Sequence, residues 1–439
     1  MKTSTLTELF ETITDRDALT ERARACGAFE RTSKVKSYDF VLALLRADCT
    51  GPFRTIASVR RAWENLTGLT IAPSSFDEHF NPGMVCLLWD LLADLMKPAN
   101  RALKRTWPPA LRSLRDILIC DGTRMPLPKA LAKTLRGTGE GQAALKVLAW
   151  LSLGDNLLTD ARVGAAVHHD RKLLRLGELV AGALYLLDLG FYDHSLFVKY
   201  DDAGALFVSR LKQSAMPTIV AVERGVRDAR HAPGKPLDDA LRYGRTVDVD
   251  AAFSAPGEPG GTRTFRVVKV QVGRTDRHDH WQGDHTDCWY VTNLDRETWT
   301  PEMISAIYRV RWAIERAWRQ MKDLARMDHL RSERPVVVFI FLASSLLLWM
   351  LGARIVRELE TNHGVGQVSH DRVFACLIEA MPDIARGLAR RTGTLDTVFH
   401  GLAAFFSREG RHPNPSQPRR VTTVFETIQS QADILRLAA

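Results

Sequence analysis

The sequence predicts an α/β protein in which an α/β domain, interrupted by a β-rich insertion, lies between helical N-terminal and C-terminal regions. Three observations lead to this expectation. The first 110 residues consist of helical patterns joined by turns. From residue 116, short apolar runs separated by turn signals replace those patterns. A helical pattern returns at Thr300 and continues to the end of the chain.

Length, charge and cysteine usage set limits on the class of protein. A chain of 439 residues is too long for one ordinary core, so we expect two to four domains. The net charge of +9 favours an acidic partner, nucleic acid first. Six scattered cysteines without a CxxC pair argue for reduced, mostly buried thiols in a cytoplasmic protein and against a zinc finger. The N-terminal segment is acidic and has no apolar stretch, so it is not a signal peptide.

Residues 1–110 are expected to form a helical, DNA-binding N-terminal domain. Within it, residues 53–80 contain a basic amphipathic helix that ends at Gly68 and a second start at Ser74, with Asp77 completing a capping box. This pattern is typical of a helix-turn-helix, which could enter a major groove, and equally of a helical bundle that only packs. The expected helices are 4–14, 16–26, 38–47, 53–66, 74–80 and 84–104.

A basic segment follows and crosses the turn at Pro108-Pro109. Its side chains could contact phosphates or simply be solvated in a connector, and both interpretations stay open. The residues are Arg101, Lys104, Arg105, Arg112 and Arg115.

The central region is predicted to contain a strand hairpin, a helix and two more strands. A domain of this layout, with carboxylates at two strand ends, is typical of a ribonuclease H-like fold. We expect it to be split into residues 111–212 and 287–360. The expected strands are 116–120, 146–153, 157–163, 184–187 and 206–211, with a helix at about 170–182.

Residues 213–286 are expected to form the β-rich insertion. Proline and glycine turn signals separate its strand candidates, and residues 288–294 then return the chain toward the Thr300 helix. The strand candidates are 218–223, 245–250 and 264–273.

Residues 336–353 are an 18-residue stretch without a charge, which reaches the threshold for a membrane span. Ser344, Ser345 and Gly352 dilute its hydrophobicity, and no second span accompanies it. We therefore expect a buried core helix and no membrane. Residues 361–439 are expected to be helical, for dimerisation or contacts with DNA ends, with an irregular proline-rich basic loop at 408–420.

Two aspartates have the setting of metal ligands. Asp121 and Asp188 each follow an apolar run and have a glycine one or two residues later, which permits close approach of a metal and a phosphate backbone. Taken singly, either could be a turn aspartate that caps its own backbone. Together with Glu315 they could hold two Mg²⁺ or Mn²⁺ ions for an in-line displacement at phosphorus.

Glu315 belongs to a helix that begins after Thr300, whose hydroxyl is the expected cap. At about 100° per residue, Tyr308, Arg311, Glu315 and Lys322 would share one stripe of this helix. Cations and a phenol beside a carboxylate suit a phosphate substrate. The alternative is a solvated helix face with i,i+4 ion pairs.

Two other groups of residues have side chains that suit metal or nuclease chemistry. The first group has no defensible zinc spacing and is interpreted as a polar loop. In the second, Asp170 is interpreted as the cap of the 170–182 helix, and the alternative is a nuclease role for a histidine. The groups are His278, Asp279, His280, His285, Asp287 and Cys288, and His168, His169 and Asp170.

The pattern Tyr308-x2-Arg311-x3-Glu315-x6-Lys322 resembles the signature of the insertion sequence four family of DDE transposases. Asp121-Gly122-Thr123 resembles the first motif of that family, and Asp188-x-Gly190-Phe191-Tyr192 its second. The resemblance covers roughly residues 70–360. It implies that Asp121, Asp188 and Glu315 are catalytic metal ligands, and that Tyr308, Arg311 and Lys322 hold phosphates near the cleaved end. Trp289 resembles the family tryptophan that stacks on a flipped base, and Trp312 is a second stacking candidate.

The resemblance also implies the activity. A bacterial, cytoplasmic protein, nucleoid-associated when bound, would hold inverted-repeat ends as a synaptic homodimer. It would nick them, excise the element through hairpin ends and join the 3′-hydroxyls to target DNA, with two Mg²⁺ or Mn²⁺ ions in each site. The alternatives are a non-catalytic DNA-binding repressor derived from such an enzyme and a metal-dependent endonuclease without strand transfer.

Overall fold

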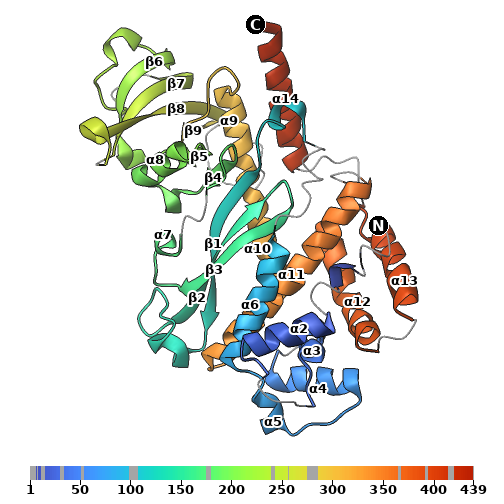
Figure 1. Cartoon of the computed structure of the whole chain (residues 1–439). Helices are drawn as coiled ribbons and strands as arrows, with labels where there is room; N and C mark the ends of the chain where they lie inside the picture. Colours follow the sequence, from blue (N-terminus) through green and yellow to red (C-terminus); the bar gives the residue numbers. More distant parts are fainter. Residues whose placement is uncertain are drawn as a thin grey trace.

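A computed structural model gives the arrangement of the chain (Figure 1). The residues whose structure it describes are 6, 8–10, 15–29, 34–50, 54–97, 107–174, 179–238, 243–255, 257–273, 285–363, 367–390, 394–413 and 420–438.

The N-terminal region is helical, as expected. Thr55 and Ser58 form a capping box at the start of α4, and Gly68 ends it with φ +71°. The start predicted at Ser74 is wrong, because α5 begins at Pro73 with Ala72 as its cap. The expected 4–14 helix lies almost wholly outside the described residues. The helices are α2 (Arg16–Ala25), α3 (Ser37–Cys49), α4 (Ile56–Thr67), α5 (Pro73–Asp77) and α6 (Pro82–Met96).

One mixed sheet of nine strands forms the centre of the molecule, in the order β3-β2-β1-β4-β5-β9-β8-β7-β6. β1 pairs antiparallel with β2 and parallel with β4, and β4 pairs parallel with β5. The first five strands are β1 (Ile117–Leu127), β2 (Ala143–Ser152), β3 (Leu157–Ala165), β4 (Leu184–Leu187) and β5 (Leu206–Arg210). The fold is thus mixed α/β with helical regions on either side, which confirms the predicted class.

The β-rich insertion extends this sheet instead of standing beside it. β9 pairs antiparallel with β5 and with β8, so the insertion strands continue the hydrogen-bonding of the central strands (Figure 1). α8 (His194–Asp202) covers one face near this junction, where the rings of Phe197 and Phe207 stack 4.8 Å apart. The insertion strands are β6 (Thr218–Val226), β7 (Tyr243–Ser254) and β8 (Thr262–Gly273), and β9 (His285–Thr292) returns the chain to the central strands.

The helix expected at 170–182 is wrong in length. α7 (Asp170–Leu173) has only four residues, and residues 175–178 lie outside the described part of the chain. The Val180 backbone N–H donates to the Tyr185 hydroxyl rather than to a helical carbonyl, and Gly182 turns with φ +74° into β4. These contacts end the helical pattern before the strand.

The long helix expected from Thr300 is interrupted. α9 (Pro301–Tyr308) passes through a 3-10 turn at Arg309–Arg311 into α10 (Trp312–Asp323), and Arg326 has φ +53° beyond its end. A 3-10 turn has three residues per turn and changes which side chains share a face. Three of the four predicted residues nevertheless stay together across this turn, because the Arg311 side chain contacts both Tyr308 and Glu315.

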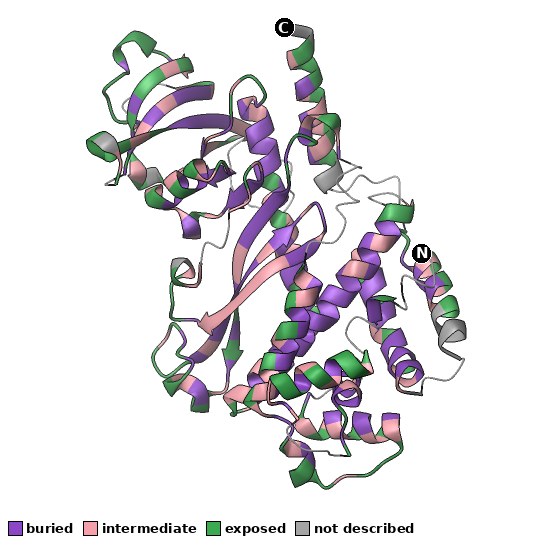
Figure 2. Cartoon of the chain, in the orientation of Figure 1, coloured by how far each residue is buried: buried purple, intermediate pink, exposed green. Residues whose placement is uncertain are grey.

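The apolar stretch 336–353 lies in α11 (Pro335–His363) and is buried, which confirms the core helix (Figure 2). Its two serines pack against a buried ion pair from the N-terminal region. Asp48 accepts from Ser344, and Arg54 donates to Ser345 at 2.7 Å while pairing with Asp48 at 2.7 Å. The serines that dilute the hydrophobicity thus satisfy a buried arginine and aspartate.

The C-terminal region is helical, as expected, and shares the core of the N-terminal helices. α11 packs against α6 and α12, and α14 packs against α9. Residues 414–419, in the expected irregular loop, lie outside the described residues. The helices are α12 (His370–Arg390), α13 (Thr394–Glu409) and α14 (Arg420–Ala438).

All six cysteines are free thiols, yet only Cys120 and Cys376 are buried, so the expectation of mostly buried thiols is wrong.

Candidate active site

The strand register brings the first two predicted carboxylates together. The parallel pairing of β1 with β4 ends at Cys120 opposite Leu187, so Asp121 and Asp188 follow at the same edge. Asp121 is not at a strand end, because β1 continues to Leu127 in its pairing with β2. The prediction of a strand-end setting is correct for Asp188 and wrong for Asp121.

The third carboxylate joins them through an arginine. Arg311, in the 3-10 turn before α10, donates from Nη2 to Glu315 Oε1 at 3.0 Å. Its Nε lies 3.8 Å from Asp188 Oδ1. The Arg311 side chain is 13% exposed, against 40% for each of the two carboxylates. The guanidinium therefore lies inside the cluster and links a strand-end aspartate to the helical glutamate.

Asp121 is the most enclosed of the three carboxylates. Burial raises the pKa of Asp121 to about 6, and the like charge of Asp188 acts in the same direction. The Gly122 backbone, the Arg311 guanidinium and the Trp318 indole oppose the rise in pKa. Trp318 Nε1 donates to Asp121 Oδ2 at 3.2 Å. A further cation that approaches Asp121 would stabilise its ionised form.

Tyr308 is buried below the end of β4. Its hydroxyl donates to the Leu187 carbonyl at 3.2 Å, immediately before Asp188, and its ring packs on Tyr290. Burial raises the pKa of Tyr308 to about 12. In this structure the phenol fixes the strand end, and its predicted contact with phosphate stays a prediction.

The remaining predicted DNA contacts differ in exposure. Trp312 is 54% exposed at the start of α10, as stacking would require. Lys322 is half-buried in the last turn of the same helix. Trp289, in β9, is half-buried with its ring edge-to-face against Tyr243 at 5.0 Å. Their roles in binding stay predictions.

The donor set suits hard divalent cations, because three carboxylates offer only oxygen ligands. Within the described part of the chain, no three Asp, Glu, His or Cys side chains already form a compact ligand group. Arg311 instead balances part of the carboxylate charge. A cation that takes up Asp188 and Glu315 must replace the contacts of Arg311 with these two side chains.

Sequence reasoning missed an ion pair, between buried Lys146 and part-exposed Asp170, that lies next to the glycines of both motifs. Lys146 of β2, with a side chain 3% exposed, lies 2.6 Å from Asp170 Oδ1 and donates to the His168 carbonyl. A Cβ on Gly122 or Gly190 would lie 3.4 Å or 3.3 Å from the Asp170 carboxylate. Both motif glycines therefore make room for the same side chain.

Asp170 is consequently not the cap of α7, a position that His169 occupies, and this prediction is wrong. A charged residue in the apolar strand of Lys146 was the available signal for such a pair.

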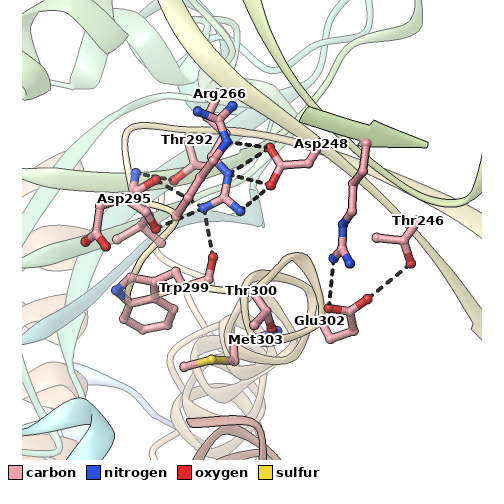
Figure 3. Close-up of polar contacts among 12 residues, drawn as sticks. Thr246, Asp248, Arg266, Thr292, Asp295, Trp299, Thr300, Glu302 and Met303 are labelled. Atoms are coloured by element: carbon pink, nitrogen blue, oxygen red, sulfur yellow. Dashed lines mark hydrogen bonds and ion pairs between the residues drawn. The ribbon is translucent and has the colours of Figure 1, made fainter. Parts of the chain in front are cut away.

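A second missed group holds the start of α9 (Figure 3). Buried Arg266 of β8 pairs with Asp248 of β7 at 2.6 Å and donates to the carbonyls of Asp295 and Trp299. Glu302, in the first turn of α9, accepts from Thr246 at 3.1 Å. The insertion therefore anchors the loop and the helix that lead to Arg311 and Glu315.

The rival groups do not assemble a site among the described residues. The described residues do not include His278, Asp279 and His280 of the first group. They also do not include Arg101, Lys104 and Arg105 of the basic segment. Asp287 is paired with Lys269 at 2.6 Å.

Comparison with known proteins gives consistent relatives. A family model described as "Transposase DDE domain" matches residues 112–351. The transposase for insertion sequence element IS231E of Bacillus thuringiensis subsp. finitimus is 20% identical over 411 residues, 84% of each chain. The transposase for IS1151 of Clostridium perfringens is 18% identical over 445 residues, 93% of each chain. The transposase for IS231F of Bacillus thuringiensis subsp. israelensis is 22% identical over 352 residues, 70% of this chain and 73% of its own.

Proposed function

We propose a cut-and-paste mechanism for this chain, which belongs to the DDE transposase family and is the phosphoryl-transfer enzyme of an insertion sequence element. Membership implies DNA as a partner and divalent metal ions as cofactors. In our proposal, two copies hold the inverted-repeat ends in a synaptic homodimer. Each copy nicks its end, releases the element through a hairpin and joins the 3′-hydroxyl to target DNA.

The central part of the sheet is, in this proposal, a ribonuclease H-like domain. Antiparallel β3, β2 and β1 followed by parallel β4 and β5 support this assignment. We retain the division into a DNA-binding region 1–110, a catalytic domain 111–212 and 287–360, a β insertion 213–286 and a C-terminal region 361–439.

Asp121, Asp188 and Glu315 are the proposed ligands of two Mg²⁺ or Mn²⁺ ions. When bound, such ions supply activation of a water or 3′-hydroxyl and stabilisation of the leaving oxygen. The observation that carries the proposal is the convergence of the three carboxylates on Arg311, from β1, from the residue after β4 and from α10. In this proposal Arg311 balances part of the charge of Asp188 and Glu315 in the free protein and contacts a DNA phosphate in the complex.

Tyr308 and Lys322 flank this guanidinium along the chain. The Tyr308 hydroxyl holds the Leu187 carbonyl and so orients the end of β4 that carries Asp188. Lys322 has no ion pair among the described residues, and we assign it to a phosphate of the DNA end.

Trp289 and Trp312 are the proposed stacking residues. Flipping a base at a sharp bend costs a few kcal/mol, and a stacked aromatic ring returns about 1–3 kcal/mol. Trp289→Ala should slow hairpin formation more than first-strand nicking, and a DNA end lacking the flipped base should partly rescue it. Equal loss of both steps, with a lowered melting temperature, would mean that Trp289 only packs against Tyr243.

The proposal is tested by incubating the protein with Mg²⁺, DNA carrying the element's ends and a target plasmid. Nicked ends, hairpins and joined products are expected in that order. Cleavage without joined products would identify an endonuclease without strand transfer. End binding without cleavage would identify a repressor.

A further inference from the structure

Trp318 contacts a carboxylate 197 positions away in the sequence. Its indole Nε1 donates to Asp121 Oδ2 at 3.2 Å, from the buried face of α10 to β1. The residue is 5% exposed, so water does not compete freely for this bond. Glu315 lies three residues earlier on the same helix.

The chemistry of this contact is directional. An indole N–H can only donate, so it binds a carboxylate oxygen and cannot itself ligate a metal ion. It occupies one lone pair of Oδ2 and restricts rotation of the Asp121 side chain. The Gly122 backbone also hydrogen-bonds this carboxylate, and the lone pairs that remain are available to an incoming cation.

We propose that Trp318 is a positioning residue that fixes Asp121 for binding a divalent cation. This inference rests on the proposed function, because it assumes that Asp121 is a ligand. One helix then carries both a ligand, Glu315, and the side chain that orients a second ligand from the sheet. Any tilt of α10 moves the two together, which preserves their relative placement.

The core alone does not require this residue. Ile314, Ala317, Gln320 and Met321 form the rest of the buried face of α10, and a phenylalanine would keep an aromatic ring, although a smaller one, in the place of the indole. What phenylalanine lacks is the N–H. Orientation of ligands by hydrogen bonds of this kind is worth about 10–100-fold in metal affinity.

The test is a calorimetric titration of the DNA-free protein with Mn²⁺. Trp318→Phe should bind Mn²⁺ about tenfold more weakly than the wild type. The matched control is Trp349→Phe, which removes an indole N–H from a buried tryptophan whose partner is the Gln320 amide at 3.4 Å. This control should bind Mn²⁺ like the wild type.

Asp121→Ala in the same titration separates this inference from the proposed function. If the wild type binds no Mn²⁺, or Asp121→Ala binds it equally well, the ligand assignment fails. If Asp121→Ala loses binding but Trp318→Phe does not weaken it, the positioning role is refuted.

A measurement without metal keeps the inference testable should Trp318→Phe fold poorly. The indole ¹H–¹⁵N resonances of the wild type are compared with those of Asp121→Asn, which keeps the side-chain shape. One buried indole resonance, protected from solvent exchange, should shift in Asp121→Asn and be absent from Trp318→Phe if that variant folds. An unchanged indole spectrum in Asp121→Asn would refute the hydrogen bond and, with it, the positioning role.

Discussion

Removing Arg311 should affect metal binding and DNA cleavage in opposite directions. In the free protein the guanidinium contacts Glu315 at 3.0 Å and Asp188 at 3.8 Å. An exposed ion pair contributes roughly 0.2–1 kcal/mol, and both carboxylates are part-exposed. Two such contacts amount to about 1 kcal/mol that a cation must overcome, so Arg311→Ala should bind Mn²⁺ about fivefold more tightly.

The assay is Mn²⁺ titration of the DNA-free variant, followed by single-turnover cleavage of an inverted-repeat end. Cleavage should fall strongly, because the proposed phosphate contact is lost. Arg309→Ala is the matched control, since Arg309 is exposed on the same turn and has no ion pair among the described residues. Unchanged or weaker Mn²⁺ binding by a folded Arg311→Ala would refute the view that Arg311 competes with the metal.

Three further outcomes follow from the packing. Lys146→Met should lower the free energy of unfolding by about 2 kcal/mol, because Asp170 loses its partner. Adding Asp170→Asn to Lys146→Met should recover part of the lost stability. If chemical denaturation shows that the losses of the two substitutions add, the pairing is contradicted. Burial raises the pKa of Asp39 to about 6. The ionised form is therefore disfavoured in the folded state, and this cost is absent below the unfolded pKa near 4. The stability of Asp39→Asn relative to the wild type should accordingly increase by about 2 kcal/mol from pH 4 to pH 7, and a flat difference in thermal melts would refute the burial argument. Because α11 is buried in the protein core, the chain should remain in the supernatant without detergent, and recovery from membranes alone would overturn that placement.

The parts of the fold that sequence predicted are those with a strong local pattern. The apolar runs of β2 and β3 and the long stretch of α11 were found because burial demands continuous hydrophobic side chains. Motif spacing likewise identified Asp121, Asp188 and Glu315, whose convergence depends on the parallel pairing of β1 with β4.

The parts that sequence did not predict depend on contacts between distant segments. The insertion is joined to the central strands through the pairing of β9 with β5, and no local sequence pattern predicts this pairing. The 3-10 turn before Trp312 falls within a strong helical pattern and buries Tyr308 against Leu187. The role of Asp170 could not be inferred because its partner, Lys146, lies on another strand.

The most direct test of the metal-dependent mechanism is single-turnover, Mg²⁺-dependent nicking of an inverted-repeat end by Asp121→Ala, Asp188→Ala and Glu315→Ala. End binding is measured in parallel without metal. The mechanism predicts that each variant binds the end like the wild type and fails to nick it. Nicking at the wild-type rate by any one of them would show that its carboxylate is not a ligand and would contradict the proposed three-carboxylate site.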